Sequence, residues 1–243
     1  MHQETLEKTP PAANAKSDWL RWFENKEFTT DWLTHKLPRW FPALAPFRDQ
    51  AVQVLDVGSF EGRSSIAFLE YLPASRVTTI DMFVDAEIEG RFDRNLAPYA
   101  DRTCKVKGRA AQVLDDLHAK GEEFDVIYLD AGKRRDEVFA HSALAWPLLK
   151  VGGVLIWDDL LWERERPAAE RPEYGIRHFC VAFADSLTIL HDGSQMIVTK
   201  TRNWPKTAGI AFYWQGVRSK ISKFRPKRAL KRLVKRFRRR LLA

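Results

Sequence analysis

Five short apolar runs in the central part of the chain each end in, or run directly into, an acidic residue or a glycine. Ligands of an open parallel sheet bind at the carboxyl ends of its strands, so these endings are the candidate site residues. An acid at a strand end can instead cap a helix, but its recurrence from run to run favours a binding site. The candidates are Asp56 through Gly62, Asp81, Gly108, Asp130 and the pair Asp158–Asp159.

The first loop reads D-V-G-S-F-E-G-R-S over residues 56–64. Gly58 allows a sharp turn, and Gly62 allows the backbone to approach a ligand closely. A helix that begins near Arg63 would point its amide groups into this loop and favour an anionic group there. The glycine spacing matches neither the dinucleotide fingerprint nor the phosphate loop of nucleotide hydrolases. Asp81 could accept hydrogen bonds from both hydroxyls of a ribose, so we expect a nucleoside ligand that lacks phosphates.

The elements that must position these residues alternate along the chain. Strands are expected over 52–58, 76–81, 103–108, 124–130 and 153–159, with helices over 64–72, 109–119 and 136–149. This alternation is typical of βαβ units and a parallel sheet. After a further helix over 176–184, runs 186–191 and 196–200 are joined by a tight D-G-S turn and must be antiparallel. We therefore predict an α/β fold, a Rossmann-like, doubly wound, seven-stranded sheet that is mostly parallel with an antiparallel strand at its C-terminal end.

Several motifs resemble those of class I S-adenosylmethionine-dependent methyltransferases. They are the first loop, the strand ending T-I-D and the stretch V-K-G-R-A-A-Q-V-L. The segments L-D-A-G-K (129–133) and G-G-V-L-I-W-D-D-L-L-W (152–162) resemble the cation-dependent O-methyltransferases of the catechol and caffeoyl-coenzyme A type. The resemblance covers roughly residues 50–200. It extends to a wider group that methylates the sugars of natural products.

The resemblance implies an enzyme that moves a methyl group from S-adenosylmethionine to a hydroxyl of a small molecule, assisted by a divalent cation. It implies catalytic roles for Lys133, as general base, and for Asp130. Metal ligands would be Asp130, Asp158 and Asp159, whose hard oxygens favour Mg²⁺ over zinc. The cofactor-binding residues would be Asp56, Gly58, Ser59, Glu61, Ser64, Asp81, Met82, Gly108, Ala110 and Asp130.

The same residues leave other interpretations open. Asp159 stands where the cation-dependent family has Asn, and the segment W-L-R-W-F over residues 19–23 fits the wider group better. Alternatives are therefore a metal-independent methyltransferase of a sugar or glycan hydroxyl, a nucleic-acid-binding methyltransferase and a cofactor-binding relic. Asp158 and Asp159 could also be helix caps without a metal, and Lys133 could be part of a solvated helix start.

Composition divides the 243 residues into four expected parts. These are a leader over 1–16, an aromatic-rich helical cap over 17–48, a methyltransferase domain over 49–203 and a basic amphipathic tail over 204–243. The cap would contain a short helix over residues 18–27, and it could cover a core edge or form a wall of a substrate pocket. The polar segment 163–175 could be a lid over the site or a plain surface loop.

Charge is distributed unevenly between these parts. The net charge is +8, but residues 217–243 carry 13 basic residues and no acid, which leaves −5 on the remainder. Apolar residues recur on one face of this tail, so it could bind an anionic membrane surface, nucleic acid or an acidic protein, or remain solvated.

We expect a cytoplasmic protein, either free or peripheral at the membrane surface, because no apolar run approaches the roughly 20 residues of a membrane span and no secretory signal is visible. The two cysteines, Cys104 and Cys180, exclude a disulfide framework and are expected in the core.

Overall fold

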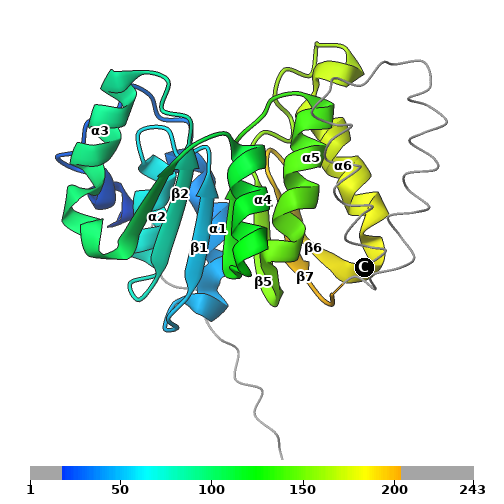
Figure 1. Cartoon of the computed structure of the whole chain (residues 1–243), viewed down its shortest axis with the longest axis horizontal. Coiled ribbons are helices and arrows are strands. Elements are labelled where there is room, and N and C mark those ends of the chain that lie inside the picture. Colours follow the sequence, from blue (N-terminus) through cyan, green and yellow to red (C-terminus); the bar gives the residue numbers. More distant parts are fainter. Residues whose placement is uncertain (1–17, 204–243) are drawn as a thin grey trace, which may run out of the picture. The chain divides into compact units, whose positions relative to one another are not determined.

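The computed structural model describes residues 18–203 (Figure 1). Contacts divide the chain into two compact units, one extending to Ala110 and the other starting at Ala111. The predicted leader over 1–16 and the basic tail over 204–243 lie outside the described residues. The predicted domain boundaries therefore stay predictions.

The first unit contains three parallel strands with β2 in the middle and β1 and β3 on either side. Val54 of β1 lies opposite Val77 of β2, and both side chains are buried. Helix α2 packs against β1 and β2. The elements are α1 (Leu37–Leu44), β1 (Gln53–Val57), α2 (Arg63–Tyr71), β2 (Arg76–Asp81), α3 (Ala86–Leu96) and β3 (Thr103–Lys107).

Aromatic side chains join the N-terminal segment to α2. The rings of Trp40 and Phe68 stack at a centroid distance of 4.7 Å, and those of Phe41 and Tyr71 stack at the same distance. The segment therefore covers an edge of the core, as predicted for a cap. The predicted helix over 18–27 is wrong in type and length, because a 3-10 helix covers only Asp18–Phe23 and buries none of its residues.

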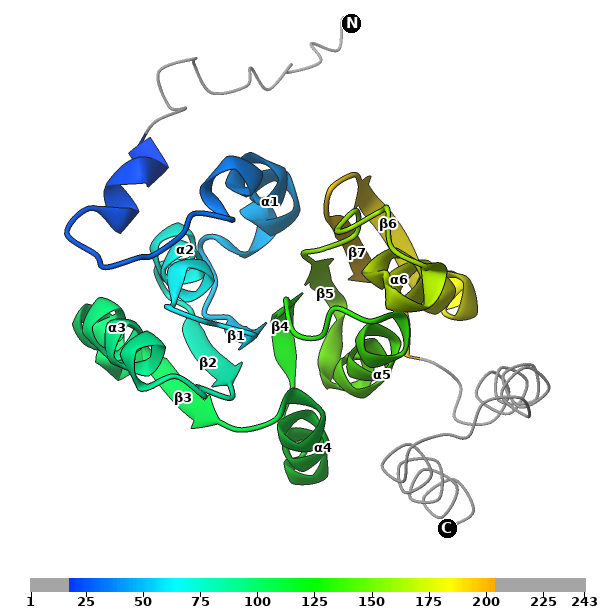
Figure 2. The same cartoon turned by 90° about the horizontal axis from the view of Figure 1, so that it is seen from above.

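The second unit contains four strands in the order β4-β5-β7-β6. Strand β7 is antiparallel to both of its neighbours, as the tight turn before it predicted. Helices α5 and α6 pack against each other and lie side by side in both views (Figures 1 and 2). The elements are α4 (Ala110–Lys120), β4 (Phe124–Leu129), α5 (Arg135–Ala145), β5 (Leu149–Trp157), α6 (Pro172–Ala182), β6 (Leu187–Asp192) and β7 (Met196–Lys200).

Several predicted boundaries are wrong. Helix α3 was missed because Phe92, Asn95 and Leu96 are its only buried residues, although Asp85 caps it by accepting a bond from the Glu87 amide. Strand β5 begins at Leu149 rather than at residue 153. The backbone of β4 approaches Gly153 so closely that a Cβ there would lie 2.8 Å from the Asp125 carbonyl oxygen. The segment with Gly152 and Gly153, which was predicted to lie before the strand or at its start, therefore lies inside β5.

Two further corrections concern single positions. Helix α6 begins at Pro172, so the polar segment after β5 is shorter than the predicted loop over 163–175. Cys180 is buried as predicted, but Cys104 is exposed because it lies on β3, a strand with only one hydrogen-bonded neighbour in its unit. Within residues 18–203, no helix combines the length and apolar composition needed to cross a bilayer.

Candidate functional site

The loop after β1 turns sharply at two glycines with left-handed backbone conformations. Gly58 has φ +93° and donates its amide to the Ile80 carbonyl oxygen at 2.8 Å, while Gly62 has φ +86°. Within this loop the Ser59 hydroxyl is buried and has no hydrogen-bond partner in the described part of the chain. A buried hydroxyl without a partner is a polar group that a ligand could satisfy. The loop therefore fits the predicted role of holding a cofactor.

Asp81, at the end of β2, is fixed by backbone donors. Its Oδ2 accepts the Phe60 amide at 3.0 Å, and its Oδ1 accepts the Phe83 amide at 2.9 Å. Phe60 and Phe83 have φ of +48° and +42°, an uncommon conformation for bulky residues. Each carboxylate oxygen retains accepting capacity after one bond, as the predicted ribose-reading role requires. Met82, predicted near the adenine, is 49% exposed.

Asp56 lies inside the fold rather than on an open surface. Its Oδ2 accepts the hydroxyls of Ser64 at 2.7 Å and Ser65 at 2.5 Å. Burial raises the pKa of Asp56 to about 6; the two serine hydrogen bonds oppose this rise, and the charge of Asp81 adds to it. Asp56 thus ties the strand to the first turn of α2, and direct contact of Asp56 or Ser64 with a cofactor stays a prediction.

Glu61 is almost fully buried, and its carboxylate is engaged by the chain itself. Its Oε2 accepts the Thr29 amide at 2.7 Å, and its Oε1 accepts the Thr29 hydroxyl at 2.9 Å. A guanidinium nitrogen of Arg91 also forms an ion pair with Glu61 Oε1 at 3.2 Å. These partners connect the N-terminal segment to the loop, a role that sequence reasoning missed. The predicted cofactor contact of Glu61 stays a prediction.

Two more predicted cofactor residues follow β3. The Gly108 amide donates to the Asp81 carbonyl oxygen at 2.8 Å, which places Gly108 beside the end of β2. Ala110 is the first residue of α4 and is half-buried.

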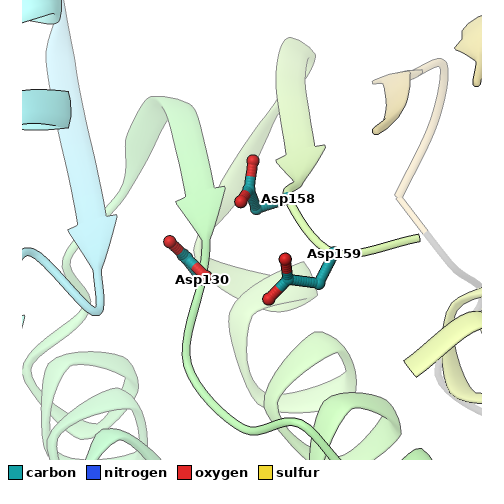
Figure 3. A group of neighbouring side chains, drawn as sticks. All are labelled: Asp130, Asp158 and Asp159. Carbon is teal, nitrogen blue, oxygen red and sulfur yellow. The ribbon is translucent and has the colours of Figure 1, made fainter. Parts of the chain in front are cut away.

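Three acids converge in the second unit. Asp130 follows β4, and Asp158 and Asp159 follow β5; the two strands are parallel neighbours, with Leu129 opposite Trp157. One carboxylate oxygen from each acid lies within 4.8 Å of the others, and Figure 3 shows the three side chains gathered at the two strand ends. Asp158 is buried, whereas Asp130 and Asp159 are half-buried. Three hard oxygen donors this close fit a divalent cation such as Mg²⁺ or Ca²⁺.

Lys133 forms ion pairs with two of these acids. Its Nζ lies 2.8 Å from Asp130 Oδ1 and also contacts Asp159 Oδ2. Burial lowers the pKa of Lys133, but the charges of Asp130 and Asp159 outweigh burial and raise the net pKa above the usual value of lysine. Burial, followed by the charge of Asp158, raises the pKa of Asp130 well above the usual value of a carboxyl group. Repulsion between these closely spaced acids opposes the ionisation of Asp130, and a divalent cation bound by the three side chains would relieve it.

Two further residues lie around this cluster: Gln195, which was missed from the sequence, and His141, which the sequence suggested is structural. The Gln195 Nε2 donates to Asp158 Oδ1 at 2.5 Å, and Gln195 is fully buried. His141 Nδ1 lies 2.8 Å from the Ala131 carbonyl oxygen and lines a small pocket with Asp130 and Asp159. Gln195 is 37 positions from Asp158, so no local pattern pointed to it.

The fold is the mostly parallel α/β fold that the sequence predicted, with the candidate acids at the carboxyl ends of its strands. The chain belongs to the O-methyltransferase family, whose model matches residues 48–207. The predicted family is therefore confirmed, and the seven-stranded sheet confirms the predicted Rossmann-like fold.

Individual relatives agree with this assignment. The chain is 34% identical over 130 residues to the mouse catechol O-methyltransferase domain-containing protein 1, covering 48% of this chain and 45% of the relative. It is 30% identical over 115 residues to a caffeoyl-CoA O-methyltransferase of Populus kitakamiensis, covering 46% of this chain and 48% of the relative. The chain thus spans a little under half the length of these curated relatives.

A solved structure shares the fold at low sequence identity. The MycE methyltransferase of mycinamycin biosynthesis, in complex with Mg, SAH and mycinamycin VI, aligns with TM-score 0.57 and 18% identity over 77% of this chain and 55% of that chain.

Proposed function

We propose that this chain is an S-adenosylmethionine-dependent O-methyltransferase that methylates a hydroxyl of a small molecule with the help of a divalent cation. The convergence of Asp130, Asp158 and Asp159 oxygens within 4.8 Å carries the proposal. Family membership supports the choice of methyl donor. In the reaction, the acceptor oxygen forms a bond to the methyl carbon, the sulfur–methyl bond breaks, and its electron pair returns to sulfur.

The residues of the first unit would bind the donor. Asp81, held by two backbone amides, would accept the ribose hydroxyls, and the buried Ser59 hydroxyl would gain a partner from the methionine part. Their fixed geometry matters because alignment of donor and acceptor can contribute about 7–11 kcal/mol to a displacement reaction.

The residues of the second unit would bind the acceptor hydroxyl and remove its proton. A divalent cation held by Asp130, Asp158 and Asp159 would supply positive charge that lowers the pKa of that hydroxyl. The bound cation would weaken the two ion pairs that Lys133 forms with Asp130 and Asp159. Lys133 Nζ would then lose its own proton more easily and could accept the proton of the hydroxyl. General-base assistance of this kind is worth about 10²–10⁴-fold in rate.

A chelator-controlled transfer assay tests this proposal. Purified full-length chain would be given labelled S-adenosylmethionine and a panel of catechols, phenols and glycosides, with EDTA and then with added Mg²⁺. We expect transfer to a hydroxyl that EDTA abolishes and Mg²⁺ restores. Full transfer to a glycoside without divalent ions would establish the metal-independent alternative. Failure to bind S-adenosylhomocysteine in calorimetry would instead favour a cofactor-binding relic.

We also propose that residues 217–243 hold the protein, in the cytoplasm, at an anionic membrane surface. Thirteen basic residues support this proposal, since each adds roughly 1 kcal/mol near such a surface. Co-sedimentation with phosphatidylserine vesicles would compare the full chain with a form ending at residue 216, and we expect only the full chain to bind. Equal sedimentation of the two forms would contradict the proposal, and stronger retention by nucleic acid would reassign the tail.

A further inference from the structure

Gln195 places a buried amide against one of the three acids. Its side chain is fully buried, and its Nε2 donates to Asp158 Oδ1 at 2.5 Å. The residue directly precedes β7, and the next residue, Met196, lies opposite Trp157 of β5. Gln195 and Asp158 therefore face each other one step beyond the end of the β5–β7 ladder.

The turn before β7 fixes the backbone of Gln195. Its carbonyl oxygen accepts the Gly193 amide at 3.0 Å. A Cβ at Gly193 would lie 2.6 Å from His191 Nε2, so the His191 side chain packs directly against this turn. The amide group thus reaches Asp158 from a constrained turn.

The bond has a chemical consequence for Asp158. Lys133 pairs with Asp130 and Asp159, whereas the Gln195 amide binds Asp158. A neutral donor on Oδ1 restrains the orientation of the carboxylate without adding a charge that would repel a cation. Groups that orient a metal ligand in this way contribute about 10–100-fold to metal affinity or activity.

We infer that Gln195 is a positioning residue that holds Asp158 in the orientation needed to bind a divalent cation. The inference rests on the proposed cation site. It assigns a function to a residue outside the strand-end motifs, 37 positions beyond the acid that it orients.

Titration of full-length protein with Mn²⁺ alone, followed by electron paramagnetic resonance, tests the inference. Gln195→Leu and Gln195→Met both remove the donor, and Met keeps the side-chain length if Leu does not fold. Thr199→Val is the matched control, because Thr199 lies on β7, the strand that Gln195 precedes, and its hydroxyl donates to the Gly153 carbonyl oxygen at 3.1 Å. Binding of S-adenosylhomocysteine, measured by calorimetry, reports on the rest of the fold.

We expect Mn²⁺ affinity to fall about 10–100-fold in both Gln195 variants, with S-adenosylhomocysteine affinity unchanged and Thr199→Val like the wild type. Unchanged Mn²⁺ affinity in a folded Gln195 variant would overturn the inference, as would parallel loss of both ligands. Asp158→Ala distinguishes the two proposals. If Asp158→Ala abolishes Mn²⁺ binding while Gln195→Met binds Mn²⁺ like the wild type, only the positioning role fails. If Asp158→Ala binds Mn²⁺ normally, the cation site fails as well.

Discussion

Lys133 shows how one side chain depends on its charged surroundings. Its ammonium lies between Asp130 and Asp159, and these charges raise its pKa. A protonated lysine cannot accept a proton, so the proposed base is inactive in this arrangement. A cation on the same carboxylates would compete with the ammonium, and cation binding and base activation would therefore be coupled.

Replacement of Lys133 by methionine separates these two effects. We expect Lys133→Met to lower methyl transfer about 10²–10⁴-fold. Mn²⁺ affinity should be unchanged or higher, because a competing positive charge is removed. Lys150→Met is the control, since Lys150 pairs with Asp125 at 2.9 Å elsewhere in the same unit. A loss of Mn²⁺ affinity in Lys133→Met alone would contradict the competition.

Asp56 predicts a pH dependence of stability. Burial raises its pKa from 3.8 to about 6, so the folded state binds this proton more tightly than the unfolded state does. The resulting stabilisation is complete below about pH 3.8 and is lost as the pH rises through about 6. Two pKa units correspond to roughly 3 kcal/mol. We expect urea unfolding to show wild type losing up to about that much between pH 4 and pH 7 relative to Asp56→Asn. Parallel pH profiles would show that Asp56 does not titrate in this way.

At the scale of elements, close backbone approach determines which helices can pack. A Cβ at Gly175 of α6 would lie 2.3 Å from the Arg135 carbonyl oxygen at the start of α5. This contact involves backbone, which cannot rotate away as a side chain can. The two helices therefore pack at a distance that only glycine permits at this point.

Two glycine substitutions test this packing against intrinsic helix propensity. Gly175→Ala should destabilise the fold by about 1–3 kcal/mol, because the added methyl forces α6 away from α5. Gly90 lies inside α3, where an added Cβ meets only the end of the Arg94 side chain at 3.2 Å. Gly90→Ala should therefore stabilise by about 0.5–1 kcal/mol. Denaturant unfolding measures the change in the free energy of unfolding of each variant. A change in the same direction for both variants would contradict the packing argument.

At the scale of the whole molecule, cation binding should stabilise folding. A ligand that binds only the folded state adds about 2.7 kcal/mol at a concentration 100 times its dissociation constant. The excess of negative charge at Asp130, Asp158 and Asp159 would also be relieved. The fold is therefore expected to be less stable without a divalent ion.

Thermal unfolding with and without Mg²⁺ measures this linkage. We expect saturating Mg²⁺ to raise the Tm of the wild type and of Asp136→Asn, whose carboxylate is 77% exposed and pairs with Arg135. The Tm of Asp159→Asn should rise less, since one charged ligand is lost. An equal rise of Tm in all three proteins would show that Mg²⁺ binds at a site that does not include Asp159.

The sequence by itself determined the class of fold and the candidate acids. Alternating strands and helices, with Asp81, Asp130 and Asp158 at or just after strand ends, are local patterns that follow from side-chain periodicity and turn chemistry. Helix α3 was not predicted because few of its side chains are buried. Strand β5 was predicted too short because its glycines resemble a turn.

Only the tertiary structure decided which partners each acid has. The pairs Glu61–Thr29, Asp158–Gln195 and Lys133–Asp159 join residues 26–37 positions apart. Contacts over such separations depend on how elements pack, and no periodicity in the sequence records them. The burial that raises the pKa of Asp56 and the charges that hold Lys133 protonated arise for the same reason.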